Sequence, residues 1–236
     1  MRKKTAFILF VITLLAILAA FSIYDKKPEK QAGDKKVIAF GDSLTYGFGD
    51  EKGSGYIDTL DKKLNEQNKE EFDFTNEAIY GLESSGILKQ LSDITVSSKL
   101  DETDYFILFI GTNDLLNSNG GNFKNLKQEE MDKGKQIYMQ NLNAIINILK
   151  ENNEDAPILL LGLYNPYPES QQIETVVDDW NKDIRDVIQK EERIKYIPTN
   201  DLFKDKDKKD YFSDSLHLND KGYKLIADRI LEKYDF

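Results

Sequence analysis

The 236-residue chain is acidic: 42 Asp and Glu oppose 32 Lys and Arg, giving a formal charge of −10, and 40% of its residues are hydrophobic. Such a charge argues against nucleic acid and strongly anionic substrates as partners. With no cysteine and one histidine, the chain has no disulfides and no zinc site built from His and Cys, and its length supports one full-sized hydrophobic core.

Residues 1–24 are expected to be a signal peptide or a membrane anchor rather than part of the fold. Basic residues at positions 2–4 precede an uncharged, mostly apolar run over 5–23, which is about long enough to cross a membrane and long for a signal peptide. The small residues near its end make a weak cleavage site, so cleavage and retention both stay open. Because the basic residues come first, the positive-inside rule places the rest of the chain outside the cytoplasm, secreted or membrane-anchored.

The polar residues 25–35 are predicted to be a linker, followed by one folded domain over 36–236. Residues 1–23 contain three basic residues and no acidic one, so the rest of the chain carries 29 Lys and Arg against 42 Asp and Glu, a charge of −13. Oligomeric state stays open.

In the domain, short apolar runs alternate with segments of helical periodicity. In chain order we expect a strand at 37–40, a helix at 56–68, strands at 72–75 and 105–110, a helix at 137–149, a strand at 158–161, a helix at 173–190, a strand at 196–197 and a helix at 220–233. Apolar strands separated by helices indicate an α/β fold with a parallel sheet covered on both faces. The weakly patterned residues 117–134 are a candidate mobile loop beside the site.

Unusual residues follow the first three strands. Ser43 comes after the first, Gly81 after the second and Asn113 after the third. Ligands of parallel sheets bind beyond the carboxyl ends of the strands, so all three residues should face one crevice. Taken singly, each has an ordinary alternative: a helix N-cap for Ser43, a turn glycine for Gly81, and a turn or helix-start asparagine for Asn113.

The sole histidine, His217, lies three residues after Asp214. This spacing lets both side chains lie on one face of a single helical turn. A serine hydrolase needs a serine nucleophile, a histidine base and an orienting carboxylate, and Ser43, His217 and Asp214 supply one of each. The alternative is a surface acid beside a surface histidine.

Four segments in order, GDSLTYG (41–47), NEAIYG (76–81), GTND (111–114) and DSLH (214–217), closely resemble the SGNH or GDSL family of serine esterases and acylhydrolases. The resemblance spans residues 37–231. It implies a three-layer α/β/α, flavodoxin-like fold and hydrolysis of acyl esters without a metal or organic cofactor.

The resemblance also assigns roles to the matching residues. It makes Ser43 the nucleophile, His217 the general base and then acid, and Asp214 its orienting carboxylate. The expected oxyanion donors are the backbone N–H groups of Ser43 and Gly81 and the side-chain amide of Asn113.

Two departures bear on this assignment. Thr45 replaces the glycine of the GxSxG elbow, which leaves the α/β-hydrolases a second choice. Leu218 stands where the family commonly has proline, a difference that concerns local backbone stiffness and not the triad.

The substrate is expected to be a small-molecule, lipid or glycan ester. Lipid acyl or lysophospholipid esters compete with O-acetyl groups on cell-surface sugars, and Tyr164 and Tyr167 in the LYNPY segment either line the acyl or alcohol pocket or belong to a rigid turn. The rival from another class is a non-catalytic, surface-anchored carbohydrate-binding or assembly module with the same fold.

Overall fold

The computed structural model describes residues 35–51, 55–67 and 71–236. The predicted targeting segment and all of the predicted linker except its last residue therefore lie outside the described residues. The first strand begins at Lys35, one residue before the predicted start of the domain.

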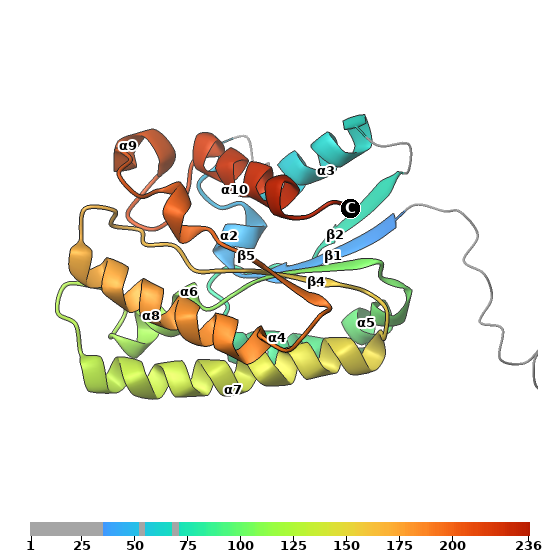
Figure 1. Ribbon diagram of the computed structural model, residues 1–236, viewed down its shortest axis with the longest axis horizontal. Helices are drawn as coiled ribbons and strands as arrows, with labels where there is room; N and C mark the ends of the chain where they lie inside the picture. The colour runs from blue at the N-terminus through green and yellow to red at the C-terminus, as the bar shows by residue number, and fades with distance from the viewer. Residues whose placement is uncertain (1–34, 52–54, 68–70) are drawn as a thin grey trace, which may run out of the picture. The chain divides into compact units, whose positions relative to one another are not determined.

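Five strands, with helices between them and after the last strand, make up the domain (Figure 1). The strands are β1 (Lys35–Gly41), β2 (Phe72–Asn76), β3 (Tyr105–Phe109), β4 (Ile158–Leu161) and β5 (Ile194–Ile197). The helices are α2 (Ser43–Tyr46), α3 (Gly55–Gln67), α4 (Ser84–Leu91), α5 (Ile94–Ser97), η1 (Leu100–Glu102), α6 (Thr112–Ser118), α7 (Gln128–Asn152), α8 (Gln171–Ile188), η2 (Asn200–Leu202), α9 (Lys208–Tyr211) and α10 (Asp220–Lys233).

The strands form one parallel sheet in the order β2-β1-β3-β4-β5. This is the flavodoxin-like order of doubly wound sheets. The predicted α/β class and the flavodoxin-like parallel sheet are therefore confirmed.

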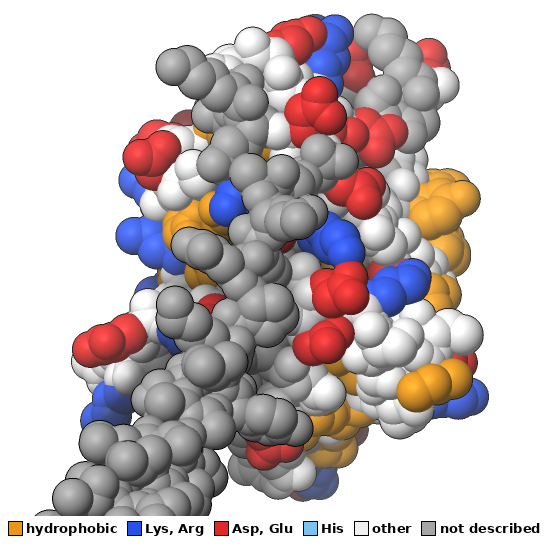
Figure 2. All heavy atoms as spheres, turned by 90° about the vertical axis from the view of Figure 1, so that its right-hand side faces the viewer, with side chains coloured by type: hydrophobic (Ala, Val, Ile, Leu, Met, Phe, Trp, Pro, Cys, Tyr) orange, Lys and Arg blue, Asp and Glu red, His pale blue; other side chains and the backbone are white. Residues whose placement is uncertain are grey.

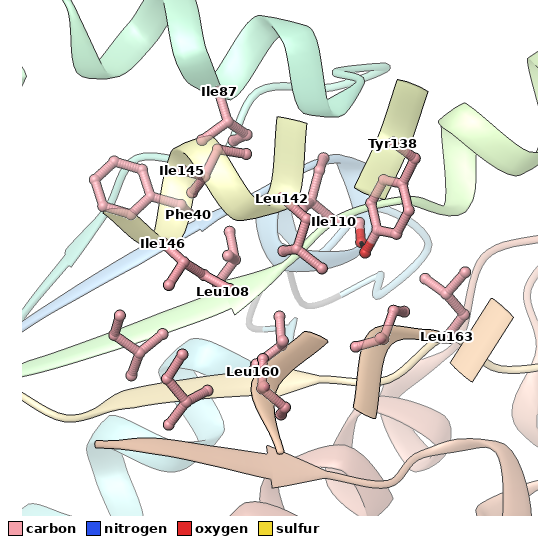
Figure 3. Packing of buried hydrophobic residues seen from close by; sticks show 14 of the residues in the cluster. Phe40, Ile87, Leu108, Ile110, Tyr138, Leu142, Ile145, Ile146, Leu160 and Leu163 are labelled. Carbon is pink, nitrogen blue, oxygen red and sulfur yellow. Dashed lines mark hydrogen bonds between the residues drawn. The ribbon is translucent and has the colours of Figure 1, made fainter. Parts of the chain in front are cut away.

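Two hydrophobic layers hold helices against the two faces of the sheet. In β1, Ile38 and Phe40 pack in one layer, whereas Val37 and Ala39 pack in the other, because successive side chains of a strand point to opposite faces. Figure 1 shows α4, α7 and α8 on one side of the sheet and α3 and α10 on the other. Figure 3 shows the first layer, in which side chains from α4 and α7 lie over β1, β3 and β4.

The predicted mobile loop at 117–134 is wrong in extent. Its first two residues end α6, and α7 begins at Gln128, nine residues before the predicted helix start. Gly134 lies inside α7 and breaks its apolar pattern, yet it is required there, because a side chain at this position would clash with Ser118. Only residues 119–127 connect the two helices.

The strand amino ends lie on the opposite side from the predicted crevice. Figure 2 views this side, where acidic and basic side chains of the described residues lie interspersed.

Among the described helices, none combines the length and apolar composition needed to cross a membrane.

Candidate active site

Ser43 is the first residue of α2, immediately beyond the carboxyl end of β1. Asp42, and not Ser43, caps this helix: its Oδ1 accepts the N–H of Leu44 at 2.9 Å. The N-cap alternative for Ser43 is therefore wrong, and its hydroxyl is free for another task. A serine at a helix start also lies near unpaired N–H groups and the positive end of the helix dipole.

Asp214 and His217 lie in the turn between α9 and α10. Asp214 Oδ1 accepts the N–H groups of Leu216 and His217, each at 2.7 Å, and its Oδ2 lies 2.7 Å from His217 Nδ1. The segment is a bend closed by the aspartate side chain, so the predicted helical turn is wrong. A spacing of three residues fits a helical turn and a bend equally well. In either geometry, Asp214 and His217 are brought together by local backbone structure.

Hydrogen bonds keep Asp214 ionised. Burial tends to raise the pKa of Asp214, but the N–H groups of His217 and Leu216 and the imidazole outweigh this effect and lower the pKa below its usual value. A carboxylate that stays charged can orient the imidazole and stabilise its protonated form.

The turn brings His217 against the serine. Ser43 Oγ lies 2.9 Å from His217 Nε2, and both residues are buried. The three predicted residues therefore form one hydrogen-bonded series across 174 positions of sequence.

Hydrogen bonds from neighbouring residues fix the position of this turn. Tyr164 donates its hydroxyl to Leu216 O at 2.8 Å, and Lys208 Nζ donates to Ser215 O at 2.7 Å. Leu218, at the position where the family commonly has proline, is fully buried and pairs with Phe212 in an isolated bridge. Tyr164 thus belongs to a rigid support and not to a pocket wall.

The proposed oxyanion donors lie on adjoining segments. The Asn113 side-chain amide donates to Leu82 O at 2.9 Å, next to Gly81, and its nitrogen also lies 3.3 Å from Asp42 Oδ2, next to Ser43. Gly81 has φ +74°, and space surrounds the position that a side chain would take. The structure brings Ser43, Gly81 and Asn113 to one edge of the sheet. Their roles in stabilising an oxyanion stay predictions.

We expect Asn113→Ala to lower kcat about 10²- to 10³-fold, because a donor to the developing oxyanion is lost while the nucleophile and base stay. Hydrolysis of p-nitrophenyl esters measures this. Asn117→Ala is the matched control: Asn117 lies one turn later on α6, is exposed and donates to Glu83, so its loss should leave kcat within about twofold. Equal rates for the two variants would contradict the role of Asn113.

Two acids, the buried Asp42 and the half-buried Asp114, lie next to these donors in the sequence. Burial raises the pKa of Asp42 to about 7, an effect that the N–H of Leu44 opposes. Burial also raises the pKa of Asp114, which accepts both the N–H and the hydroxyl of Ser84. Each acid holds a turn that carries a predicted donor, so both are positioning groups.

The raised pKa of Asp42 predicts a pH-dependent stability. Between an unfolded pKa near 3.9 and a folded value of about 7, the native state holds a proton that the unfolded chain has released, so stability falls as pH rises through this window. Asparagine is as good a helix N-cap as aspartate but does not ionise. Asp42→Asn therefore keeps the cap and removes the fall in stability with rising pH. We expect the variant to gain on the order of 2–3 kcal/mol relative to the parent between pH 5 and pH 8. Urea unfolding at both pH values measures this; a pH-independent difference would refute it.

Aromatic residues that the sequence analysis missed surround the imidazole. The Phe48 ring lies edge-on to His217 at 4.6 Å between centroids, the Tyr80 ring lies 6.0 Å away and nearly parallel, and Phe48 and Tyr80 are 5.0 Å apart. Phe48 directly follows one of the four recognised segments and Tyr80 lies within another, and this proximity is the sequence signal that could have identified them.

Across residues 35–51, 55–67 and 71–236, no three His, Cys, Asp or Glu side chains are grouped to hold a metal ion.

The chain is similar to known proteins over most of its length. Residues 39–225 match the model of the GDSL-like Lipase/Acylhydrolase family. The protein YpmR of Bacillus subtilis is 30% identical, over 98% of this chain and 96% of its own. The spore germination lipase LipC of Bacillus licheniformis is 26% identical, over 81% and 92%. The crystal structure of the lipase Lip_vut3 from a goat rumen metagenome superposes with a TM-score of 0.77 at 25% identity, over 84% of this chain and 97% of that one.

Proposed function

This chain belongs to the GDSL-like lipase/acylhydrolase family and is a carboxylic ester hydrolase, and from that premise we propose that it is an extracytoplasmic serine esterase using Ser43, His217 and Asp214. The observation that carries the proposal is the hydrogen-bonded series of 2.9 Å from Ser43 Oγ to His217 Nε2 and 2.7 Å from His217 Nδ1 to Asp214 Oδ2.

In the proposed reaction, Ser43 Oγ attacks the ester carbonyl and passes its proton to His217 Nε2. The oxyanion is stabilised by the N–H groups of Ser43 and Gly81 and by the Asn113 amide. His217 then gives the proton to the leaving alkoxide, which departs as the alcohol and leaves an acyl-serine. Water then attacks the acyl-serine carbonyl and gives a proton to His217. His217 returns this proton to Ser43 Oγ as the acyl bond breaks, which releases the carboxylic acid and free Ser43.

The substrate classes proposed are lipid acyl or lysophospholipid esters and O-acetyl groups on cell-surface sugars. The lipase names of LipC and Lip_vut3 support acyl ester hydrolysis. The basic start and apolar run of residues 1–24 support export across a membrane. Protease treatment of intact cells should digest the full-length protein if its domain is outside the cytoplasm, whereas recovery in the cytosolic fraction would refute this location.

The serine mechanism is tested with a fluorophosphonate, which phosphonylates an activated serine. We expect the adduct on Ser43 by mass spectrometry and a parallel loss of ester hydrolysis. An unreactive Ser43 in a folded protein that still binds cell-wall glycans would favour the non-catalytic binding module instead.

A further inference from the structure

Four exposed apolar side chains lie on the two segments that flank Ser43 and His217. Tyr46 and Phe48, on α2 and the turn after it, are 60% and 42% exposed, and Ile79 and Tyr80, on the segment after β2, are 48% and 58% exposed. We call these four residues the apolar rim. We propose that the apolar rim binds the alkyl chain of the acyl group, so that the enzyme favours acyl esters longer than acetate. This rests on the proposed function of Ser43.

Hydrogen bonds make the two segments one surface. Asn76 Nδ2 donates to Thr45 O at 2.9 Å, and the N–H of Ile79 donates to Gly41 O at 3.1 Å. The edge-to-face contact of Phe48 with Tyr80 closes the surface next to the imidazole. The rim is therefore held beside the reacting atoms rather than carried on an independent loop.

Exposure shows what an incoming ester meets first. Ser43 and His217 are 3% and 7% exposed, far less than the four rim residues, two of which, Phe48 and Tyr80, contact the His217 ring. Exposed apolar residues of soluble proteins are normally scattered singly, and a cluster beside a nucleophile indicates a binding surface. A substrate at Ser43 Oγ therefore lies next to the rim rings that contact His217.

The chemistry of the rim fits an alkyl chain better than a sugar ring. Ile79 is aliphatic and offers neither a flat ring nor a hydrogen bond, and the ring surfaces of Phe48 and Tyr80 are partly used against each other and against His217. Gly81, the predicted oxyanion donor, directly follows Ile79 and Tyr80. An ester carbonyl oxygen bound at the Gly81 N–H would bring the first carbon of the acyl chain close to this segment.

The test compares kcat/KM of the full-length protein, in one fixed detergent, for p-nitrophenyl acetate, butyrate and hexanoate. Burying a methylene gives up to about a fourfold gain, so partial burial predicts a two- to fourfold rise per methylene from acetate to hexanoate. Tyr46→Ser/Ile79→Ser leaves the rings that contact His217 in place. This variant should flatten the rise. Tyr80→Ala should flatten the rise as well, with a lower rate for every ester.

Ile94→Ser/Ile137→Ser is the matched control, because these side chains, on α5 and α7, are 75% and 58% exposed and lie outside the rim. This control should keep the rise. A second series holds the acyl group at butyrate and lengthens the alcohol, and the rim variant should leave its length dependence unchanged.

Three results would overturn the proposal: a parent that prefers acetate, a rim variant that keeps the parental rise, or a rim effect that follows alcohol length. Phosphonylation of Ser43 separates these results from failure of the proposed function. A labelled Ser43 without a rim effect refutes only the rim, whereas absent labelling together with absent hydrolysis refutes both.

Discussion

Ser43→Ala is expected to lower kcat for ester hydrolysis on the order of 10⁴- to 10⁶-fold, because the attacking oxygen is removed while the rest of the site stays. The structure makes this a clean experiment. Asp42 caps α2, so the substitution leaves the cap intact and should change the free energy of unfolding by less than about 1 kcal/mol. Active-site titration and p-nitrophenyl ester kinetics measure the loss.

The matched control is Ser118→Ala, at the end of α6, whose hydroxyl donates to Leu115 O. Its rate should stay within about twofold of the parent. The serine mechanism would fail if Ser43→Ala, folded to the same unfolding midpoint, kept more than about one hundredth of the parental kcat. If Ser43→Ala loses both its activity and its fold, the serine mechanism is tested instead by the fluorophosphonate adduct on Ser43 of the parent protein.

The fold could be predicted largely because the central strands β3 and β4 are apolar throughout. The bounds of β4 and α10 were predicted as the structure has them, since an apolar run and a helix flanked by polar turns define both ends. Short helices were missed: α4 and α6 have eight and seven residues, too few for periodicity to indicate a helix. Their formation depends on packing against α7, which sequence periodicity does not report.

The predicted site residues came from four short segments, and the structure brings those segments to one edge of the sheet. The spacing of residues in the sequence does not show which side chains of different segments contact each other. The 3.3 Å approach of Asn113 to Asp42 joins positions 71 residues apart, and Phe48 meets His217 across an even longer separation. The Asp214 turn was mistaken for a helical turn because the same spacing serves both. Such contacts depend on tertiary packing, so they can be seen in the structure but cannot be predicted from local sequence.

Asp214→Asn is expected to lower kcat about 10³- to 10⁴-fold while preserving the turn. The asparagine Oδ1 can still accept the N–H groups of Leu216 and His217, which close the bend at 2.7 Å each. At the other position, an NH₂ group now faces His217 Nδ1 and donates to it. The imidazole must then carry its proton on Nε2, which donates to Ser43 instead of accepting from it, so the base is lost.

Asp214→Ala separates this effect from support of the turn. It removes the acceptor for both N–H groups, so it should lower the unfolding midpoint, whereas Asp214→Asn should not. Asp210→Asn, an exposed acid on α9, is the control for charge alone and should keep the parental rate. Steady-state kinetics should show the loss in kcat, with KM changed less than about threefold, because the substitution alters the protonation of the imidazole and not the surface that meets the substrate. A tenfold or smaller loss for Asp214→Asn would mean that His217 holds its productive tautomer through other contacts and that Asp214 mainly shapes the turn.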